Sequence, residues 1–92
     1  MSDVKVTLSS ALARFAAEER SFVVRSGTVA EVIDQISARH PALRQYLLDE
    51  SGIVLPFISI YIGEDNIRDL PSRDVAVPET ATVLITSAVA GG

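Results

Sequence analysis

Residues 28–39 carry the pattern of an amphipathic helix, set among segments that are patterned as strands. Thr28 is followed three residues later by Glu31, which is the spacing of a capping box at a helix N-terminus. Pro41 disfavours helical geometry at His40 and should end the helix there. Apolar residues recur at helical spacing and form one stripe: Val29, Val32, Ile33 and Ile36. A lone helix with one apolar stripe must bury that stripe against another element, so a sheet is expected beneath it.

Several segments alternate apolar and polar residues with the period of a half-buried strand. Residues 4–8, 57–62 and 82–87 show this alternation, and residues 21–25 are rich in β-favouring side chains. A brief strand pairing is expected near residues 66–68. Residues 11–20 could hold a short helical turn through Leu12, Phe15 and Ala16, but we interpret this brief segment as a turn-like connection. We expect one or two further helical turns around residues 43–47. The order predicts an α+β fold in which a mixed four- to five-stranded sheet packs on one main helix.

The composition of the chain limits its partners and its location. Its 92 residues, 48% of them hydrophobic, suffice for one domain with a single core. The net charge of -4 disfavours nucleic acid as a partner, because phosphates would be repelled. No apolar segment is long enough to span a membrane, the N-terminal residues lack the pattern of a leader, and cysteine is absent. We therefore expect a cytoplasmic protein that does not bind membranes.

The usual patterns of catalytic and metal-binding residues are missing from the sequence. The single histidine, His40, lies at a predicted helix C-terminus, where its positive charge, when protonated, would interact favourably with the helix dipole. The adjacent acidic pairs, such as Glu18 and Glu19, are typical of solvated surface charge. A metal site needs several ligands and a triad needs a nucleophile beside its base. We predict no catalytic residue and no metal site.

The last five residues, Ala88, Val89, Ala90, Gly91 and Gly92, follow the final predicted strand and have no expected partner within the chain. We therefore expect a folded domain over residues 1–87 and a flexible tail over residues 88–92. Glycine has no Cβ and accepts backbone angles closed to other residues, so a diglycine end suits a narrow channel. Five residues reach at most about 17 Å, which is enough to enter a shallow active site.

Four stretches together resemble the MoaD/ThiS family of ubiquitin-like sulfur carriers. They are SGTVAEVIDQI (26–36), HPAL (40–43), ISIYIGEDNIR (58–68) and AVAGG (88–92). The similarity covers almost the whole chain. Within the family, the sequence most resembles the CysO-like and archaeal small-modifier branches. The resemblance implies a β-grasp fold.

The resemblance also implies a mechanism in which the chain is a carrier and not an enzyme. A ubiquitin-activating-type adenylyltransferase would use ATP to adenylate the carboxylate of Gly92, and sulfide or a persulfide would displace AMP. The Gly92 thiocarboxylate would then deliver sulfur to a biosynthetic acceptor enzyme, in the making of molybdopterin, a thiazole or cysteine. The chain itself would bind no cofactor.

The outward faces of the strands supply three candidates for a partner-binding surface: Phe57, Tyr61 and Leu84. An exposed apolar patch of this kind is typical of interaction sites. The competing interpretation is that residues 43–48 or the loop at Pro71 cover them. The family often places bulky apolar residues beside this face, where the chain has Ser9 and Thr86.

Two other functions fit the same sequence. The chain could be a protein modifier attached to target lysines through Gly92, and its single lysine, Lys5, leaves little scope for self-linked chains. It could instead be a β-grasp interaction module with an incidental tail. A residue appended after Gly92 should abolish the carrier and modifier functions and leave an interaction module unaffected.

Overall fold

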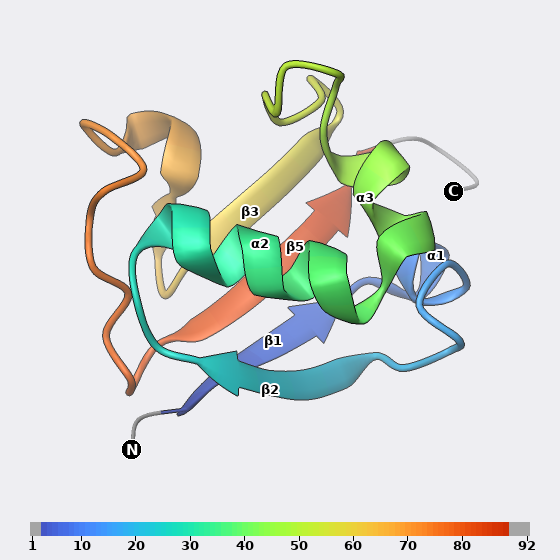
Figure 1. Ribbon diagram of the computed structural model, residues 1–92, viewed down its shortest axis with the longest axis horizontal. Coiled ribbons are helices and arrows are strands. Elements are labelled where there is room, and N and C mark those ends of the chain that lie inside the picture. The colour runs from blue at the N-terminus through green and yellow to red at the C-terminus, as the bar shows by residue number, and fades with distance from the viewer. Residues whose placement is uncertain (1–2, 89–92) are drawn as a thin grey trace.

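Five strands form one mixed sheet in the order β2-β1-β5-β3-β4 (Figure 1). The structure is a computed structural model that describes residues 3–88. The central pair β1 and β5 is parallel, and every other neighbouring pair is antiparallel. The strands are β1 (Asp3–Leu8), β2 (Ser21–Arg25), β3 (Ile58–Ile62), β4 (Asp65–Asn66) and β5 (Thr82–Ser87). The predicted mixed α+β architecture is confirmed.

The helices are α1 (Ser10–Ala13), α2 (Val29–Arg39) and α3 (Pro41–Leu47), with a 3-10 turn η1 (Ile67–Asp69) before the last loop. Helix α2 begins at the predicted capping box. The Thr28 Oγ1 accepts a hydrogen bond from the Glu31 N–H at 3.2 Å, and the Glu31 Oε1 accepts one from the Thr28 N–H at 2.9 Å. The helix ends at Arg39, and Pro41 begins α3, a position where its missing N–H has no cost. The predicted extra helical turn is therefore α3.

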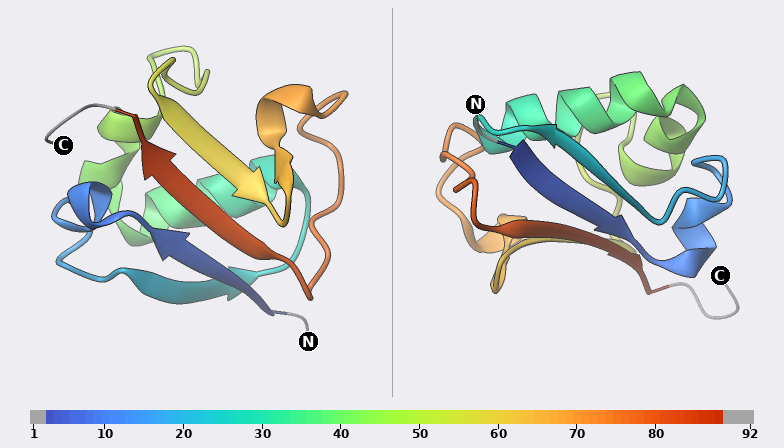
Figure 2. Two further views of the ribbon diagram at one scale, coloured as in Figure 1. Left: turned by 180° about the vertical axis from the view of Figure 1, so that it is seen from behind. Right: turned by 90° about the horizontal axis from the view of Figure 1, so that it is seen from below.

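The core lies between the sheet and helices α2 and α3, which cover one of its faces (Figure 2). Alternate residues of each long strand point into this core, as the alternation predicts, and the others point away. The largest side chains that are almost fully buried are Ile36, Leu43, Leu47, Ile58, Ile60 and Ile85. Among the described residues, the opposite face of the sheet carries no helix (Figure 2). No helix within residues 3–88 has the length and apolar character needed to cross a bilayer.

Two local predictions are wrong. Residues Ser10–Ala13 form one helical turn, α1, where the turn-like connection was preferred to the short helical turn that the sequence also allowed. Ala17 and Glu18 then adopt left-handed backbone angles, with φ values of 52° and 64°, and reverse the chain toward β2. The brief pairing expected over residues 66–68 instead involves Asp65 and Asn66, which pair with Ile62 and Tyr61, and the chain turns directly afterwards into η1.

Candidate partner surface and tail root

The uncovered face of the sheet presents an apolar pair formed by Tyr61 and Leu84. These residues are direct register partners on β3 and β5, so their side chains lie side by side. Leu84 is 38% exposed and Tyr61 is half-buried. Leu84 also faces Thr7 on β1. The structure thus brings together two of the three residues predicted for the partner surface.

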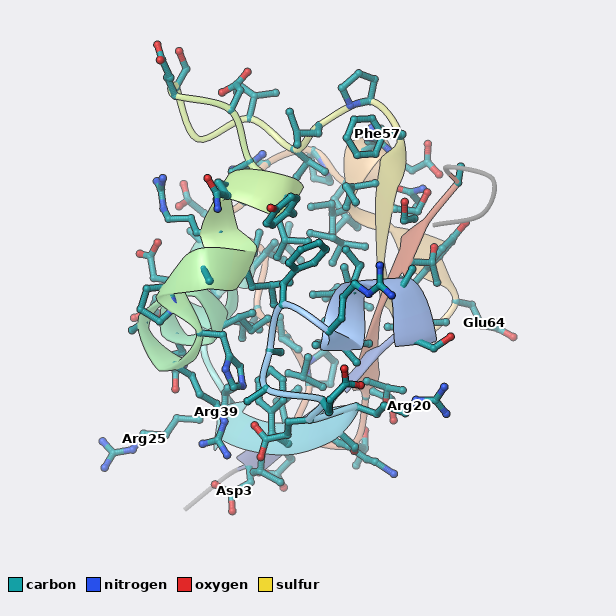
Figure 3. The ribbon with its side chains drawn as sticks, turned by 90° about the vertical axis from the view of Figure 1, so that its right-hand side faces the viewer. Asp3, Arg20, Arg25, Arg39, Phe57 and Glu64 are labelled. Atoms are coloured by element: carbon teal, nitrogen blue, oxygen red, sulfur yellow. The ribbon has the colours of Figure 1, made fainter. Side chains whose placement is uncertain are left out.

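Phe57, the third predicted residue, lies at the end of the sheet, just before β3 begins. Its side chain is 41% exposed (Figure 3). Phe57 and Leu84 are therefore not covered by residues 43–48 or by the Pro71 loop, and the competing interpretation is wrong for both. Phe57 does not share the register position of the Tyr61–Leu84 pair. It belongs instead to the region where the tail leaves the sheet.

The first residue of the predicted tail has a partner within the chain. The Ala88 N–H donates a hydrogen bond to the Phe57 carbonyl oxygen at 2.8 Å, which continues the pairing of β5 with β3 by one residue. The expectation that Ala88 has no internal partner is therefore wrong. The other predicted tail residues, Val89, Ala90, Gly91 and Gly92, lie outside the described residues.

We call the end of β5 at Ser87 and Ala88, together with the neighbouring Phe57, the tail root. An apolar pocket of about 280 Å³ lies beside it. Helix α1 and its following turn form one wall, α3 forms another, and Phe57 and Ser87 complete the lining. The rings of Phe15 and Tyr46 stack with centroids 3.7 Å apart and an angle of 18° between their planes. This stack joins the turn after α1 to α3. The remaining lining residues are Ala11, Leu12 and Arg14.

Sequence reasoning missed this pocket because it treated residues 11–20 as a connection. The signal was present, since Leu12, Phe15 and Ala16 recur at helical spacing. Four helical residues are too few to establish a period, however. Nothing in the sequence pairs Phe15 with Tyr46, which lies 31 positions later.

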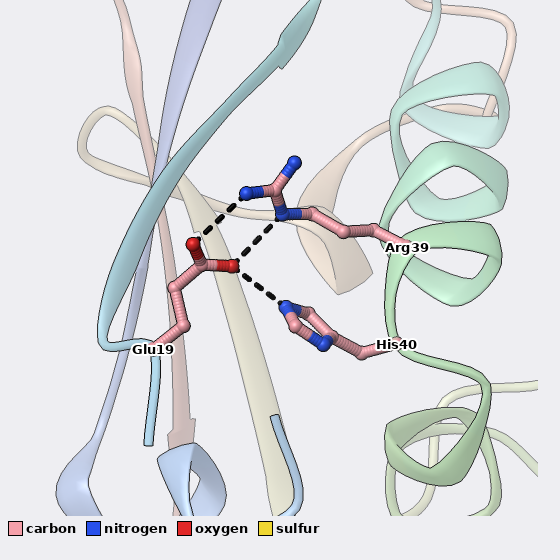
Figure 4. Close-up of polar contacts among 3 residues, drawn as sticks. All are labelled: Glu19, Arg39 and His40. Atoms are coloured by element: carbon pink, nitrogen blue, oxygen red, sulfur yellow. Dashed lines mark hydrogen bonds and ion pairs between the residues drawn. The ribbon is translucent and has the colours of Figure 1, made fainter. Parts of the chain in front are cut away.

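A charged cluster holds the turn after α1 against the end of α2 (Figure 4). The Arg39 Nε and Nη2 donate to the two carboxylate oxygens of Glu19 at 2.8 and 2.9 Å. The His40 Nε2 lies 2.8 Å from the Glu19 Oε1. Hydrogen bonds from Arg39 and then His40 lower the pKa of Glu19 to about 2. The His40 ring also meets Phe22 edge-on, with centroids 5.2 Å apart. At the predicted helix end, His40 therefore contacts both the turn after α1, through Glu19, and β2, through Phe22.

No group of three or more histidine, cysteine, aspartate or glutamate side chains within residues 3–88 is arranged to hold a metal ion. The arrangement offers instead an exposed apolar surface, a backbone ladder that leads to the tail, and a pocket at the tail root. These features suit docking against another protein.

Known proteins resemble the chain over nearly its full length. Sulfur carrier protein CysO of Mycobacterium tuberculosis is 26% identical over 92 residues, which are 98% of this chain and 99% of the relative. No protein-family model matches the chain.

Solved structures show the same fold. CysO of Amycolatopsis orientalis, solved in a complex with BexX, has a TM-score of 0.83 and 29% identity, covering 97% of this chain and 99% of that one. Small archaeal modifier protein 1 of Methanosarcina acetivorans has a TM-score of 0.81 and 26% identity, covering 100% and 98%. The β-grasp fold is thereby confirmed. The chain is thus homologous to sulfur carrier protein CysO over nearly its full length, and its fold is that of the ubiquitin-like β-grasp proteins.

Proposed function

We propose that the chain carries sulfur as a thiocarboxylate on Gly92. The observation that carries the proposal is the homology to CysO over 98% of this chain and 99% of that relative. The diglycine ending of the sequence supports it, because two residues without a Cβ pass through a narrow channel. In this function the chain is a co-substrate of partner enzymes in the cytoplasm, and the reacting group is its own carboxylate.

The proposed chemistry has two balanced steps. The Gly92 carboxylate attacks the α-phosphorus of ATP and releases pyrophosphate, which gives an acyl-adenylate on the activating enzyme. A sulfide or persulfide sulfur then attacks the acyl carbon and AMP leaves, with cleavage of the S–S bond by a reductant when a persulfide is the donor. The resulting thiocarboxylate gives its sulfur to a biosynthetic acceptor in cofactor or cysteine synthesis. ATP is consumed by the partner, and this chain needs no bound cofactor.

The activating enzyme would dock on the open sheet face and the tail root. Leu84 and Tyr61 supply paired apolar contacts, and Phe57 extends them toward Ala88. Buried aromatic and aliphatic anchors contribute much of the binding energy of protein interfaces. The structure of CysO with BexX is a complex between a CysO protein and another protein, which supports a docking function for the corresponding chain here.

The absence of cysteine makes the proposal directly testable. A thiol-alkylating reagent applied near neutral pH has no thiol to modify in this chain, so a thiocarboxylate would be its preferred target. We expect labelling of the protein purified from its own host, located on Gly92 by peptide fragmentation. A variant with one alanine appended after Gly92 serves as the control and should remain unlabelled. Equal labelling of both proteins, or of neither, would contradict the proposal.

The second candidate is a protein modifier joined to lysines through Gly92. The similarity to small archaeal modifier protein 1, 26% identical over the whole chain, favours it. A modifier predicts covalent adducts of higher mass in which Gly92 is linked to a target lysine. Such adducts, found together with a labelled free chain, would show that both functions operate.

A further inference from the structure

We propose that a pocket between the loop before β3 and the segment around η1 binds an acidic segment of a partner protein. The pocket has a volume of about 230 Å³ and shares no lining residue with the tail-root pocket. Two arginines, Arg68 and Arg73, line it beside an apolar floor. The apolar lining consists of the buried Val54 and Ile67, the half-buried Leu70 and the exposed Ile53.

Both guanidinium groups are held in place by backbone carbonyl oxygens. The Arg73 Nη1 donates to the Gly52 oxygen at 2.6 Å, and the Arg68 Nη2 donates to the Leu55 oxygen at 2.7 Å. Each guanidinium has five N–H donors, so these bonds leave donors available. The two guanidinium groups are thereby held against the loop before β3. Their positive charges are not neutralised, because carbonyl oxygens carry no net charge.

The loop that holds them is itself fixed. The Asp49 Oδ1 accepts hydrogen bonds from the Ser51 and Ile53 N–H groups at 2.8 and 2.9 Å. Gly52 turns the chain with a φ of +82°, which an L side chain rarely adopts. The pocket is therefore preorganised, which reduces the entropy lost on binding.

Neither arginine has a carboxylate partner. Across residues 3–88 the ion pairs all belong to Glu19, which binds Arg39 and His40. Asp69 and Asp74 follow the two arginines in the sequence, but they are exposed and do not line the pocket. A chain with a net charge of -4 thus presents in one pocket two guanidinium groups that form no ion pair, which is a site for an anion.

The shape and lining indicate which anion. The volume is below the roughly 300 to 1,000 Å³ typical of small-molecule sites and suits one or two side chains. The apolar floor favours a carboxylate that is accompanied by an aliphatic group, as in a Leu-Glu segment. Ile53 is 57% exposed at the rim and offers the first apolar contact. This inference does not depend on the chemistry of Gly92.

Nuclear magnetic resonance titration of the full ¹⁵N-labelled chain tests the proposal. The probe is the peptide acetyl-Ala-Leu-Glu-Glu-Ala-amide, and the matched control replaces both glutamates with glutamine. We expect the acidic peptide to shift the backbone amide signals of Gly52, Ile53, Arg68 and Arg73. The glutamine peptide should bind about tenfold more weakly, because it lacks the charge-assisted hydrogen bonds.

Variants separate the site from the overall charge of the chain. Arg68→Gln should weaken binding of the acidic peptide about tenfold while leaving the Arg73–Gly52 hydrogen bond intact. Arg44→Gln, on the exposed side of α3, removes the same charge elsewhere and should leave binding unchanged. Equal binding of the two peptides, equal effects of the two variants, or shifts caused by inorganic phosphate and not by the acidic peptide would overturn the proposal.

Discussion

Leu84 is the residue at which the proposed partner surface can be tested with least harm to the fold. It is 38% exposed on the open face, so Leu84→Asp should lower the free energy of unfolding by about 1 kcal/mol or less. We expect the yield of thiocarboxylate to fall at least tenfold, because a charge would be placed against an apolar partner contact. Labelling by a thiol-alkylating reagent measures the yield.

Val23→Asp is the matched control for this prediction. Val23 is 53% exposed and lies on the edge strand β2, where it pairs with Lys5 and is separated from β5 by β1. Val23→Asp should leave the yield of thiocarboxylate close to that of the protein with its original sequence. Equal losses in the two variants would show that Leu84 is not part of a specific partner surface.

Glu19 should make a pH-dependent contribution to stability. Its pKa is lowered from 4.5 to about 2 by hydrogen bonds from Arg39 and His40. A carboxylate with a lowered folded-state pKa stabilises the fold above its unfolded pKa, and the contribution is lost as the pH falls through the folded value. Glu19→Gln should therefore be less stable than the unmodified protein at neutral pH, and the difference should shrink between pH 4.5 and about 2.

Urea unfolding at several pH values measures this difference. Glu18→Gln is the control, because Glu18 is the exposed neighbour of Glu19 and does not belong to the cluster drawn in Figure 4. It should show little change across the same range. A Glu19→Gln difference that stays constant with pH would contradict the assignment of the lowered pKa.

At the scale of elements, helix α2 depends on its capping box. Thr28→Ala removes the acceptor for the Glu31 N–H and should lower the free energy of unfolding by about 1 kcal/mol. Thr80→Ala, in the exposed turn before β5, is the control and should change it little. Chemical denaturation of both variants measures the effect, and equal stabilities would contradict the capping function.

The elements that the sequence predicted well are those with a strong local signal. The capping box and apolar stripe locate α2, and alternation locates β3 and β5 to within one residue. Helix α1 was missed because four residues cannot show a period. The pairing near residues 66–68 was misplaced because a two-residue strand carries no alternation at all.

At the scale of the whole molecule, the contacts that assemble the site are non-local. The parallel pairing of β1 with β5 joins Lys5 to Thr82, and no local pattern predicts it. The Phe15–Tyr46 stack and the Arg39–Glu19 pair likewise join segments that are far apart in the sequence. Exposure of Phe57 and Leu84 was one of two open interpretations, because it depends on where α3 and the last loop pack. Alternation alone placed both residues on outward faces.

The intact mass of the protein isolated from its own host tests the central claim most directly. Fragmentation of the C-terminal peptide would locate any exchange of oxygen for sulfur. The sulfur-carrier account predicts a fraction of chains with one such exchange at Gly92. A carboxylate that remains unmodified there, even after incubation with ATP, sulfide and the cognate activating enzyme, would contradict it.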